Sequence, residues 1–227
     1  MKKTTKLIAV LLILNSSIYQ SKAQDTMKKL NLTKEYPAYY QAGLEPVTIT
    51  LDAINYLTIK GQSAPEDQKF IGAIEAIYPI AYGIKAYYKA QEKDFVVPKM
   101  ECIWWVADGN NFEETPKEEW FWKIIIRMPE FVDTKTFMAT KGAVSVKKKL
   151  KRLNDVNFEE INEGKCIQVL HLGSYDDEAA SIEKIFKLMG ENDFRLNGYH
   201  HEIYISGPTK TAVENLKTII RYPVIKN

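Results

Sequence analysis

The sequence has few residues of the kinds that mark unusual protein classes. Its 227 residues include only 2 cysteines, 3 histidines, 11 glycines and 9 prolines. These counts exclude a disulfide-dense scaffold, a collagen-like chain and a low-complexity chain. An excess of one charge is also missing, because 31 basic residues face 29 acidic ones, which argues against nucleic acid as a partner. The length suits one large globular domain or two small ones.

The N-terminal residues have the three-part pattern of a secretory signal peptide. Lysines precede an unbroken apolar run at 7–14, and Ser21-Lys22-Ala23 offers small residues to a signal peptidase. The run is too short to cross a bilayer as a stable helix. We expect cleavage after Ala23 and export to the periplasm or beyond, with no stable membrane insertion afterwards. A retained N-terminal anchor, or a start at Met27, stays open as an alternative.

Loss of the signal peptide changes the charge of the chain. Residues 1–23 contain four lysines and no acids, so the mature chain has 27 basic and 29 acidic residues. Export would permit Cys102 and Cys166 to oxidise, and two buried free thiols are the alternative. We divide the chain into the signal peptide, an N-terminal segment at 24–45 and one domain at 46–227.

The order of predicted elements occurs twice. Strands at 47–49 and 56–59 are followed by a helix that begins with a capping box at Ser63-Ala-Pro-Glu66. Pro79 should kink that helix. Strands at 95–105 and 120–127 complete the first half. In the second half we predict a strand at 166–172, a second capping box at 174–177 with a helix after it, and strands at 195–205 and 216–224.

The last strands of the two halves match each other. Lys123-Ile-Ile-Ile-Arg-Met-Pro129 agrees with Lys217-Thr-Ile-Ile-Arg-Tyr-Pro223 at five of seven positions, 94 residues apart. Between the halves, residues 133–153 indicate a helix capped by Asp133 and ending in a basic run. A solvated helix face explains that run better than binding to an anionic surface, because no aromatic residues interleave with the charges.

These patterns predict an α+β fold made of two strand-helix-strand-strand units with pseudo-two-fold symmetry. Each helix should cover one face of its sheet. The remaining sheet faces should bury each other or leave a central groove, and that groove is the candidate ligand site.

Aromatic residues gather on the strands that would line the groove. Side chains alternate along a strand, so Trp120 and Trp122 share a face, whereas Trp104 and Trp105 point to opposite faces. One of the latter pair should enter the core and the other the groove. Taken alone, tryptophans on strands are more often core residues than a ligand cage.

A carboxylate in the middle of a predicted strand is the most informative single residue. In residues 199–205, His200, Glu202 and Tyr204 share one face. Burial would raise the pKa of such an acid unless a donor or a cationic ligand compensates, and perturbed carboxylates gather at functional sites. An ion pair with a neighbouring Arg or Lys is the structural alternative.

Metal and haem sites have little support. The only histidines are His171, His200 and His201, and adjacent strand residues face opposite ways, so the last two cannot share an ion without distortion. Ligand spacings such as Cys-x-x-Cys are absent from the sequence. We therefore expect no metal and no cofactor.

Four blocks of the sequence resemble the GyrI-like small-molecule-binding domain, and most closely its stand-alone bacterial branch. The resemblance covers residues 46–227. The four blocks are Pro-Lys-Met-Glu101-Cys-Ile-Trp104-Trp105, Glu119-Trp120-Phe-Trp122-Lys123, His200-His-Glu-Ile-Tyr-Ile-Ser206 and Leu216-Lys-Thr-Ile-Ile-Arg221.

The resemblance implies a ligand cleft between two repeated units. Drug-sensing regulators use this domain to bind aromatic, often cationic compounds around a central glutamate, whose place Glu202 takes here. Some stand-alone members are hydrolases that open cyclopropane-bearing DNA alkylators. By the same resemblance Trp104, Trp105, Trp120 and Tyr204 are cage candidates. No helix-turn-helix segment is present, so a regulator role does not carry over.

Two functions follow as hypotheses. The first is binding of aromatic or cationic xenobiotics in the cleft by Trp104, Trp105, Trp120, Trp122, Glu202 and Tyr204. The second is hydrolysis of strained-ring electrophiles, with Glu202 as general base and Tyr204 as hydrogen-bond donor. The partner expected in both cases is a small molecule, and the oligomeric state stays open.

Overall fold

The computed structural model describes residues 29–227, so the predicted signal peptide lies outside the described residues. The described chain has nine strands and five α-helices. The strands are β1 (Val47–Leu51), β2 (Ile54–Gln62), β3 (Glu101–Trp105), β4 (Phe121–Arg127), β5 (Asn157–Ile161), β6 (Gly164–Leu172), β7 (Phe194–Leu196), β8 (His200–Tyr204) and β9 (Lys217–Lys226). The helices are α1 (Leu32–Glu35), α2 (Pro37–Tyr40), α3 (Gln68–Lys89), α4 (Thr134–Lys147) and α5 (Ala179–Glu191).

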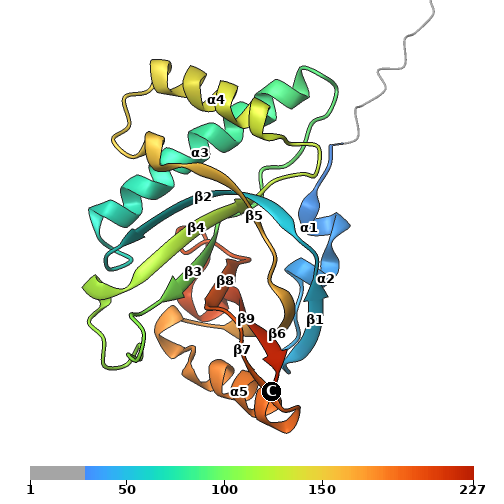
Figure 1. Cartoon of the computed structure of the whole chain (residues 1–227), viewed down its shortest axis with the longest axis vertical. Coiled ribbons are helices and arrows are strands. Elements are labelled where there is room, and N and C mark those ends of the chain that lie inside the picture. The colour runs from blue at the N-terminus through green and yellow to red at the C-terminus, as the bar shows by residue number, and fades with distance from the viewer. Residues whose placement is uncertain (1–28) are drawn as a thin grey trace, which may run out of the picture.

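Eight of the strands form one continuous antiparallel sheet in the order β1-β6-β9-β8-β3-β4-β2-β5, with β7 paired to β9. The β3–β8 pair joins two halves of the same design, β2-α3-β3-β4 and β6-α5-β8-β9. This confirms the predicted α+β class and the repeated unit. In Figure 1, α3 lies above β2 with α4 on its outer side, and α5 lies at the opposite end of the molecule.

The first strand belongs to the other half of the sheet. β1 pairs with β6, while β5 takes the outer place beside β2. The prediction that 47–49 and 56–59 belong to the same half was therefore wrong. The loop between β1 and β2 is only two residues long, yet these two strands do not pair with each other. The β1–β6 and β2–β5 pairs therefore link the two halves through the sheet.

The groove also differs from the prediction. Paired residues of adjacent antiparallel strands share a face, so the register Ile220–Glu202–Cys102–Ile124 runs along one face of the sheet. The helix α3 packs on Ile124 in one core, and α5 packs on Ile220 in another. Both helices therefore cover the same face, and the cleft lies between them rather than between two uncovered faces.

Helix α3 begins later than the predicted capping box. Asp67 is its N-cap and accepts a hydrogen bond from the Lys69 N–H. Ser63 is buried instead, and its Oγ accepts a hydrogen bond from Trp122 Nε1 at 3.1 Å. The ring of Trp122 lies so close to β2 that a Cβ on Gly61 would be 2.4 Å from it. Phe70, Ile77 and Ile84 of α3 are buried, and the helix continues through Pro79.

Helix α4 starts where the sequence predicts and ends earlier. Asp133 caps it by accepting from the Thr136 N–H at 2.7 Å, and Lys147 is its last residue. It lies tightly against α3, since a Cβ on Gly83 would be 2.6 Å from Thr140 Cγ2. The basic residues 147–149 and 151 are exposed.

Two predicted strands are shorter than expected. Only β3 within 95–105 is a strand, and Phe95 instead forms an isolated bridge with Leu30. The strand predicted at 195–205 divides into β7 and β8 around Gly198, where an added Cβ would be 2.7 Å from Pro223. Ser174 does cap a helical turn, but this turn is a 3-10 segment (Tyr175–Asp177) that precedes α5.

The second face of the sheet is covered by the short helices α1 and α2. Tyr39, Tyr40 and Leu32 pack there against Ile125, Ile203 and Ile219. Cys102 and Cys166 are both buried free thiols.

Candidate functional site

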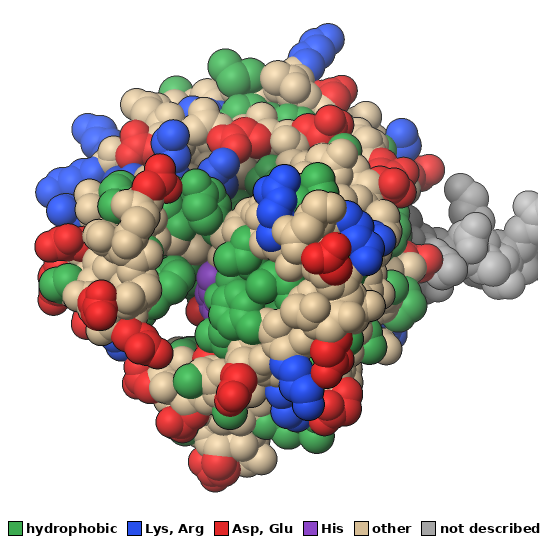
Figure 2. Space-filling view, turned by 60° about the horizontal axis from the view of Figure 1, so that its bottom comes forward, with side chains coloured by type: hydrophobic (Ala, Val, Ile, Leu, Met, Phe, Trp, Pro, Cys, Tyr) green, Lys and Arg blue, Asp and Glu red, His purple; other side chains and the backbone are tan. Residues whose placement is uncertain are grey.

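A wide cleft of about 1600 Å³ opens between α3 and α5. Its floor is formed by β3, β8 and β9, and the segments 106–113 and 206–210 border it. Figure 2 shows this hollow with apolar side chains on its walls and a histidine in its depth. Most of the lining is apolar, and a few charged groups gather on the floor, which is the usual composition of a small-molecule site.

Glu202 lies on the floor of the cleft, as the alternation of β8 predicts. It is paired with Cys102 of β3 and Ile220 of β9, and its side chain is 13% exposed. His200 and Tyr204 also line the cleft, whereas His201 and Ile203 point to the opposite face. The ion pair with Arg or Lys that we considered as the structural alternative is not formed by Glu202 within residues 29–227.

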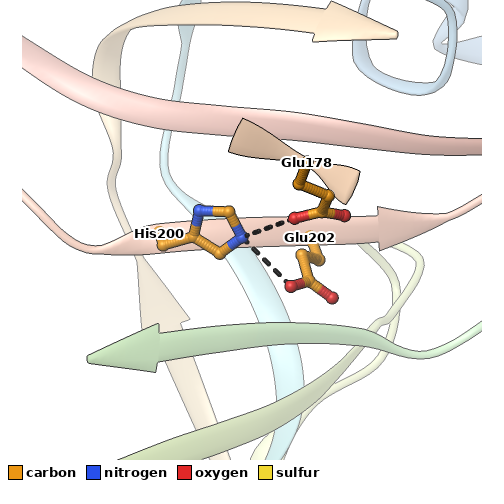
Figure 3. Close-up of side chains that lie close together, drawn as sticks. All are labelled: Glu178, His200 and Glu202. Atoms are coloured by element: carbon orange, nitrogen blue, oxygen red, sulfur yellow. Dashed lines mark hydrogen bonds and ion pairs between the residues drawn. The ribbon is translucent and has the colours of Figure 1, made fainter. Parts of the chain in front are cut away.

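Glu202 is part of a cluster with His200 and Glu178, drawn in Figure 3. The Nε2 atom of His200 lies 3.0 Å from Glu202 Oε1 and 3.4 Å from Glu178 Oε2. The other ring nitrogen, Nδ1, lies 2.8 Å from the hydroxyl of Tyr222. Glu178 is 6% exposed, and its Oε1 is buried with no hydrogen-bond partner.

The cluster shifts the ionisation of its members. Burial opposes a charge on His200, but the hydrogen bonds to Glu178 and Glu202 outweigh it and raise the pKa of His200 well above its ordinary value. Burial, followed by repulsion from Glu202, raises the pKa of Glu178 to about 7. Burial and the nearby Glu202 carboxylate also raise the pKa of Tyr204. Near neutral pH the cluster therefore holds an imidazolium, and Glu178 exchanges a proton in the same pH range.

The same three residues are the group that could hold a metal ion within the described chain. One donor atom from each lies within 4.8 Å of the others. Coordination would need the deprotonated Nε2 of His200, and the raised pKa of this imidazole opposes that form. The other histidines lie elsewhere, His171 beside Ser174 and Ser181 and His201 on the opposite face.

Aromatic rings surround the carboxylates. Trp104 and Trp120 approach each other edge to face with centroids 6.1 Å apart, and Phe112 packs on Trp120 at 4.9 Å. The ring of Tyr175 lies 5.7 Å from that of Tyr204. These five residues all line the cleft and form what we call the aromatic wall.

The other two tryptophans named from sequence differ in position. Trp105 projects from the opposite face of β3, stacks between Phe121 and Tyr199, and also reaches the cleft lining. Trp122 is fully buried under α3 and does not appear among the lining residues. Of the pair at 104–105, Trp104 is thus the one that shares the face of Glu202, and it belongs to the core as well.

The sequence analysis missed Glu178, Phe112, Tyr175 and Tyr222. A signal for Glu178 exists, because it precedes Ile182 and Ile185 by four and seven residues and therefore falls on the inward stripe of α5. An acid at such a position indicates a buried carboxylate. No comparable pattern marks Phe112, which lies in the loop after β3.

The fold and cleft define a class of protein, a duplicated α+β domain with a wide cleft between the helices α3 and α5. The model of the GyrI-like small molecule binding domain matches residues 44–225, and the chain belongs to this family. The match confirms the resemblance seen in the sequence. It implies a small-molecule ligand, whose identity it leaves open.

Several solved structures are similar to this chain. An uncharacterized conserved protein from Listeria innocua is 29% identical with a TM-score of 0.82, over 87% of this chain and all of that one. A hydrolase encoded by lin2189 from Listeria innocua is 28% identical with a TM-score of 0.80 and the same coverage. The EcmrR C-terminal domain, 15% identical with a TM-score of 0.51 over 81% of this chain and 98% of its own, shares the fold.

No curated protein matches the sequence. Among residues 29–227, none of the helices is long and apolar enough to cross a membrane.

Proposed function

We propose that the protein binds small aromatic or cationic organic compounds in the cleft between α3 and α5. The observation that carries this proposal is the position of Glu202, a carboxylate on the cleft floor within a largely apolar lining. Membership in a small-molecule-binding family supports it.

The two parts of the site contribute differently to binding. The aromatic wall supplies apolar area and cation–π attraction of about 0.5–2 kcal/mol per contact. Glu202 supplies charge complementarity, which is stronger in a partly enclosed cleft than in water. A neutral aromatic compound would use only the first part, and an aromatic cation would use both.

This difference gives the test. The probes are 9-anthracenylmethylammonium, a cation, and the uncharged 9-methylanthracene, measured by fluorescence titration. We expect Glu202→Gln to weaken the cation about tenfold or more and the neutral probe less than twofold, because one charge-assisted contact is lost. The exposed acid Glu183 at the cleft edge provides the matched control, Glu183→Gln, which should change neither. Equal weakening of both probes by Glu202→Gln would refute the role of this carboxylate.

A second candidate is hydrolysis of strained-ring electrophiles in the same cleft. The proton-exchanging cluster favours it, and so do the structures from Listeria innocua described as hydrolases. Water would attack a cyclopropane carbon, and the ring bond would break with its electrons moving to a conjugated carbonyl. Glu202 would take the proton of the attacking water, and Tyr204 would donate a hydrogen bond to the developing oxyanion.

The hydrolase candidate is tested with a cyclopropane-bearing DNA alkylator and product analysis by mass spectrometry. We expect a ring-opened product that gains one water, and loss of about 100-fold or more in rate with Glu202→Ala. Tyr204→Phe should reduce the rate less. Full turnover by both variants would exclude these roles.

We also propose that the mature protein is exported, because of the N-terminal pattern of charge, apolar run and small residues. Mass spectrometry of the protein from whole cells and from the extracellular or periplasmic fraction tests this. An N-terminus at Gln24 is expected, and an intact Met1 in all fractions would contradict it.

A further inference from the structure

The two carboxylates of the cleft meet a single hydrogen-bond donor. In an imidazolium, the Nε2–H of His200 points between Glu202 Oε1 and Glu178 Oε2, while the second N–H is directed to Tyr222. Figure 3 shows one oxygen of each carboxylate turned to the imidazole and the other turned away. An ionised carboxylate accepts hydrogen bonds only, at about four lone-pair sites. The cluster therefore has many more acceptors than donors.

One carboxylate oxygen of the cleft cluster has no hydrogen-bond donor. Glu178 Oε1 is buried without a partner, although its residue lines the cleft. A buried carboxylate oxygen without a hydrogen-bond donor is unfavourable. A group that enters the cleft and donates to Glu178 would recover this free energy.

The opposite face of the same strand carries a similar cluster that contains a second cation. The Nε2 atom of His201 lies 3.0 Å from Glu101 Oε2, and its Nδ1 atom lies 2.9 Å from Glu163 Oε1. The Nη1 atom of Arg221 lies 3.2 Å from Glu163 Oε2. That cluster has two carboxylates and two cationic side chains. The cleft cluster has two carboxylates and one imidazole, and no Lys or Arg of residues 29–227 pairs with either acid.

Lysines of the cleft do not fill this place. Lys99 donates to the carbonyl of Ile205, and Lys117 pairs with Asp176 at 3.0 Å. Lys210, the third lysine of the lining, forms no ion pair with Glu178 or Glu202. The cleft cluster thus lacks a second cation that its counterpart has, and the missing group would come from outside the chain.

We infer that the ligand is a protonated amine or amidine whose N–H groups bridge Glu202 and Glu178, rather than a quaternary cation. This inference rests on the proposed binding function and names the ligand's charged group. An aromatic wall alone suits a quaternary ammonium, which has no N–H and is held by cation–π attraction. Two carboxylates with an unmet acceptor instead suit a cation with two or more donors.

The experiment uses a methylation series with constant charge and a constant ring system. The probes are 9-anthracenylmethylammonium, its N,N-dimethyl and its N,N,N-trimethyl derivatives, with three, one and zero N–H donors, titrated at pH 7 with EDTA present to exclude metal ions. We expect the affinity for wild-type protein to fall about tenfold or more from the primary to the quaternary cation, the ratio that one charge-assisted hydrogen bond supplies.

Two variants assign the selectivity. Glu178→Gln should reduce the ratio between primary and quaternary probes to less than about threefold, while the control Glu183→Gln keeps it. Circular dichroism and thermal unfolding verify that both variants fold.

The outcomes separate the inference from the proposed function. If the quaternary probe binds as tightly as the primary one, the inference is overturned and the binding function stands. If neither the three cations nor 9-methylanthracene bind, the proposed function itself fails. If the cations bind but no better than 9-methylanthracene, the carboxylates do not recognise the charge, and the inference is overturned while binding of aromatic compounds stands. If the ratio is large but unaffected by Glu178→Gln, Glu178 is not the acceptor, and the inference is again overturned.

Discussion

Two neighbouring histidines on β8 belong to clusters of nearly the same composition with opposite properties. On the back face, His201 joins Glu101, Glu163 and Arg221, and this back cluster is closed by the helices α1 and α2. On the cleft face, His200 joins Glu178 and Glu202. Each cluster leaves one carboxylate oxygen unpaired, Glu101 Oε1 or Glu178 Oε1, but only that of Glu178 belongs to a residue that lines the cleft.

The difference between the clusters lies in the second cation. In the back cluster, burial opposes ionisation of Glu163, but His201 and Arg221 outweigh it and lower the pKa of Glu163 to about 2. In the cleft, burial and Glu202 raise the pKa of Glu178 to about 7. The same type of residue is thus held ionised in one place and close to neutrality in the other. The second cation holds Glu163 ionised inside the fold, whereas the proposed ligand would supply the corresponding cation beside Glu178.

The largest expected effect is on the back cluster. Arg221→Met should lower the free energy of unfolding by about 3–5 kcal/mol, because it leaves Glu163 buried with less compensation. Urea denaturation measures this. Arg221→Lys keeps the charge but loses the guanidinium contacts to Gln168 and the Tyr39 carbonyl, so an intermediate loss is expected. A loss below 1 kcal/mol in Arg221→Met would show that the back cluster is not a stabilising element.

A smaller effect of the back cluster should appear in acid. Because the folded pKa of Glu163 lies near 2 and its ordinary value is 4.5, its contribution is present above pH 4.5 and is lost as the pH falls through 2. We expect a loss on the order of 3 kcal/mol from this group across that window. Denaturation curves from pH 6 to 2 test it against Glu163→Gln, whose acid dependence should be weaker. Equal slopes for the two proteins would contradict the assignment.

The smallest effect concerns the cleft cluster and has the opposite sign. The folded pKa of Glu178 is above its ordinary value, so this acid reduces stability once the pH rises above about 4.5, and fully so above about 7. Glu178→Gln should therefore raise the free energy of unfolding at pH 8 by up to about 1 kcal/mol, after the lost contact to His200 is allowed for, and have little effect at pH 4. Thermal unfolding at both pH values measures this. If Glu178→Gln instead lowers the free energy of unfolding at pH 8, Glu178 stabilises the fold and the expectation is wrong.

Much of the fold could be predicted from local patterns. Alternation on β8 placed His200, Glu202 and Tyr204 on one face, and the match between 123–129 and 217–223 indicated the duplication. Asp133 was identified as a cap because an Asx cap needs only the N–H two or three residues later. Alternation and capping depend on residues close in sequence, whose relative side-chain directions are fixed by the repeat of the strand or helix.

Other features could not be predicted because they depend on partners far away in the sequence. Ser63 looked like a cap but bonds to Trp122, and β1 pairs with β6 rather than with β2. The cleft lies on the helix-covered side because both helices pack on the same face of one sheet. Competing long-range contacts decided each of these outcomes.

The sequence alone determined the strand and helix periods and the face on which Glu202 lies, since these follow from side-chain direction along a local element. It also determined the repeat, because the two halves carry matching residues. Only the tertiary structure decided that Glu178 joins Glu202 and that Arg221 joins Glu163. Packing of α5 against β6 and β9 brings Glu178 to the cleft floor, and pairing of β6 with β9 brings Glu163 to Arg221. Charge interactions are strong only over a few ångströms. The local pattern could therefore predict on which face an acid lies, but its partners depend on the assembled sheet.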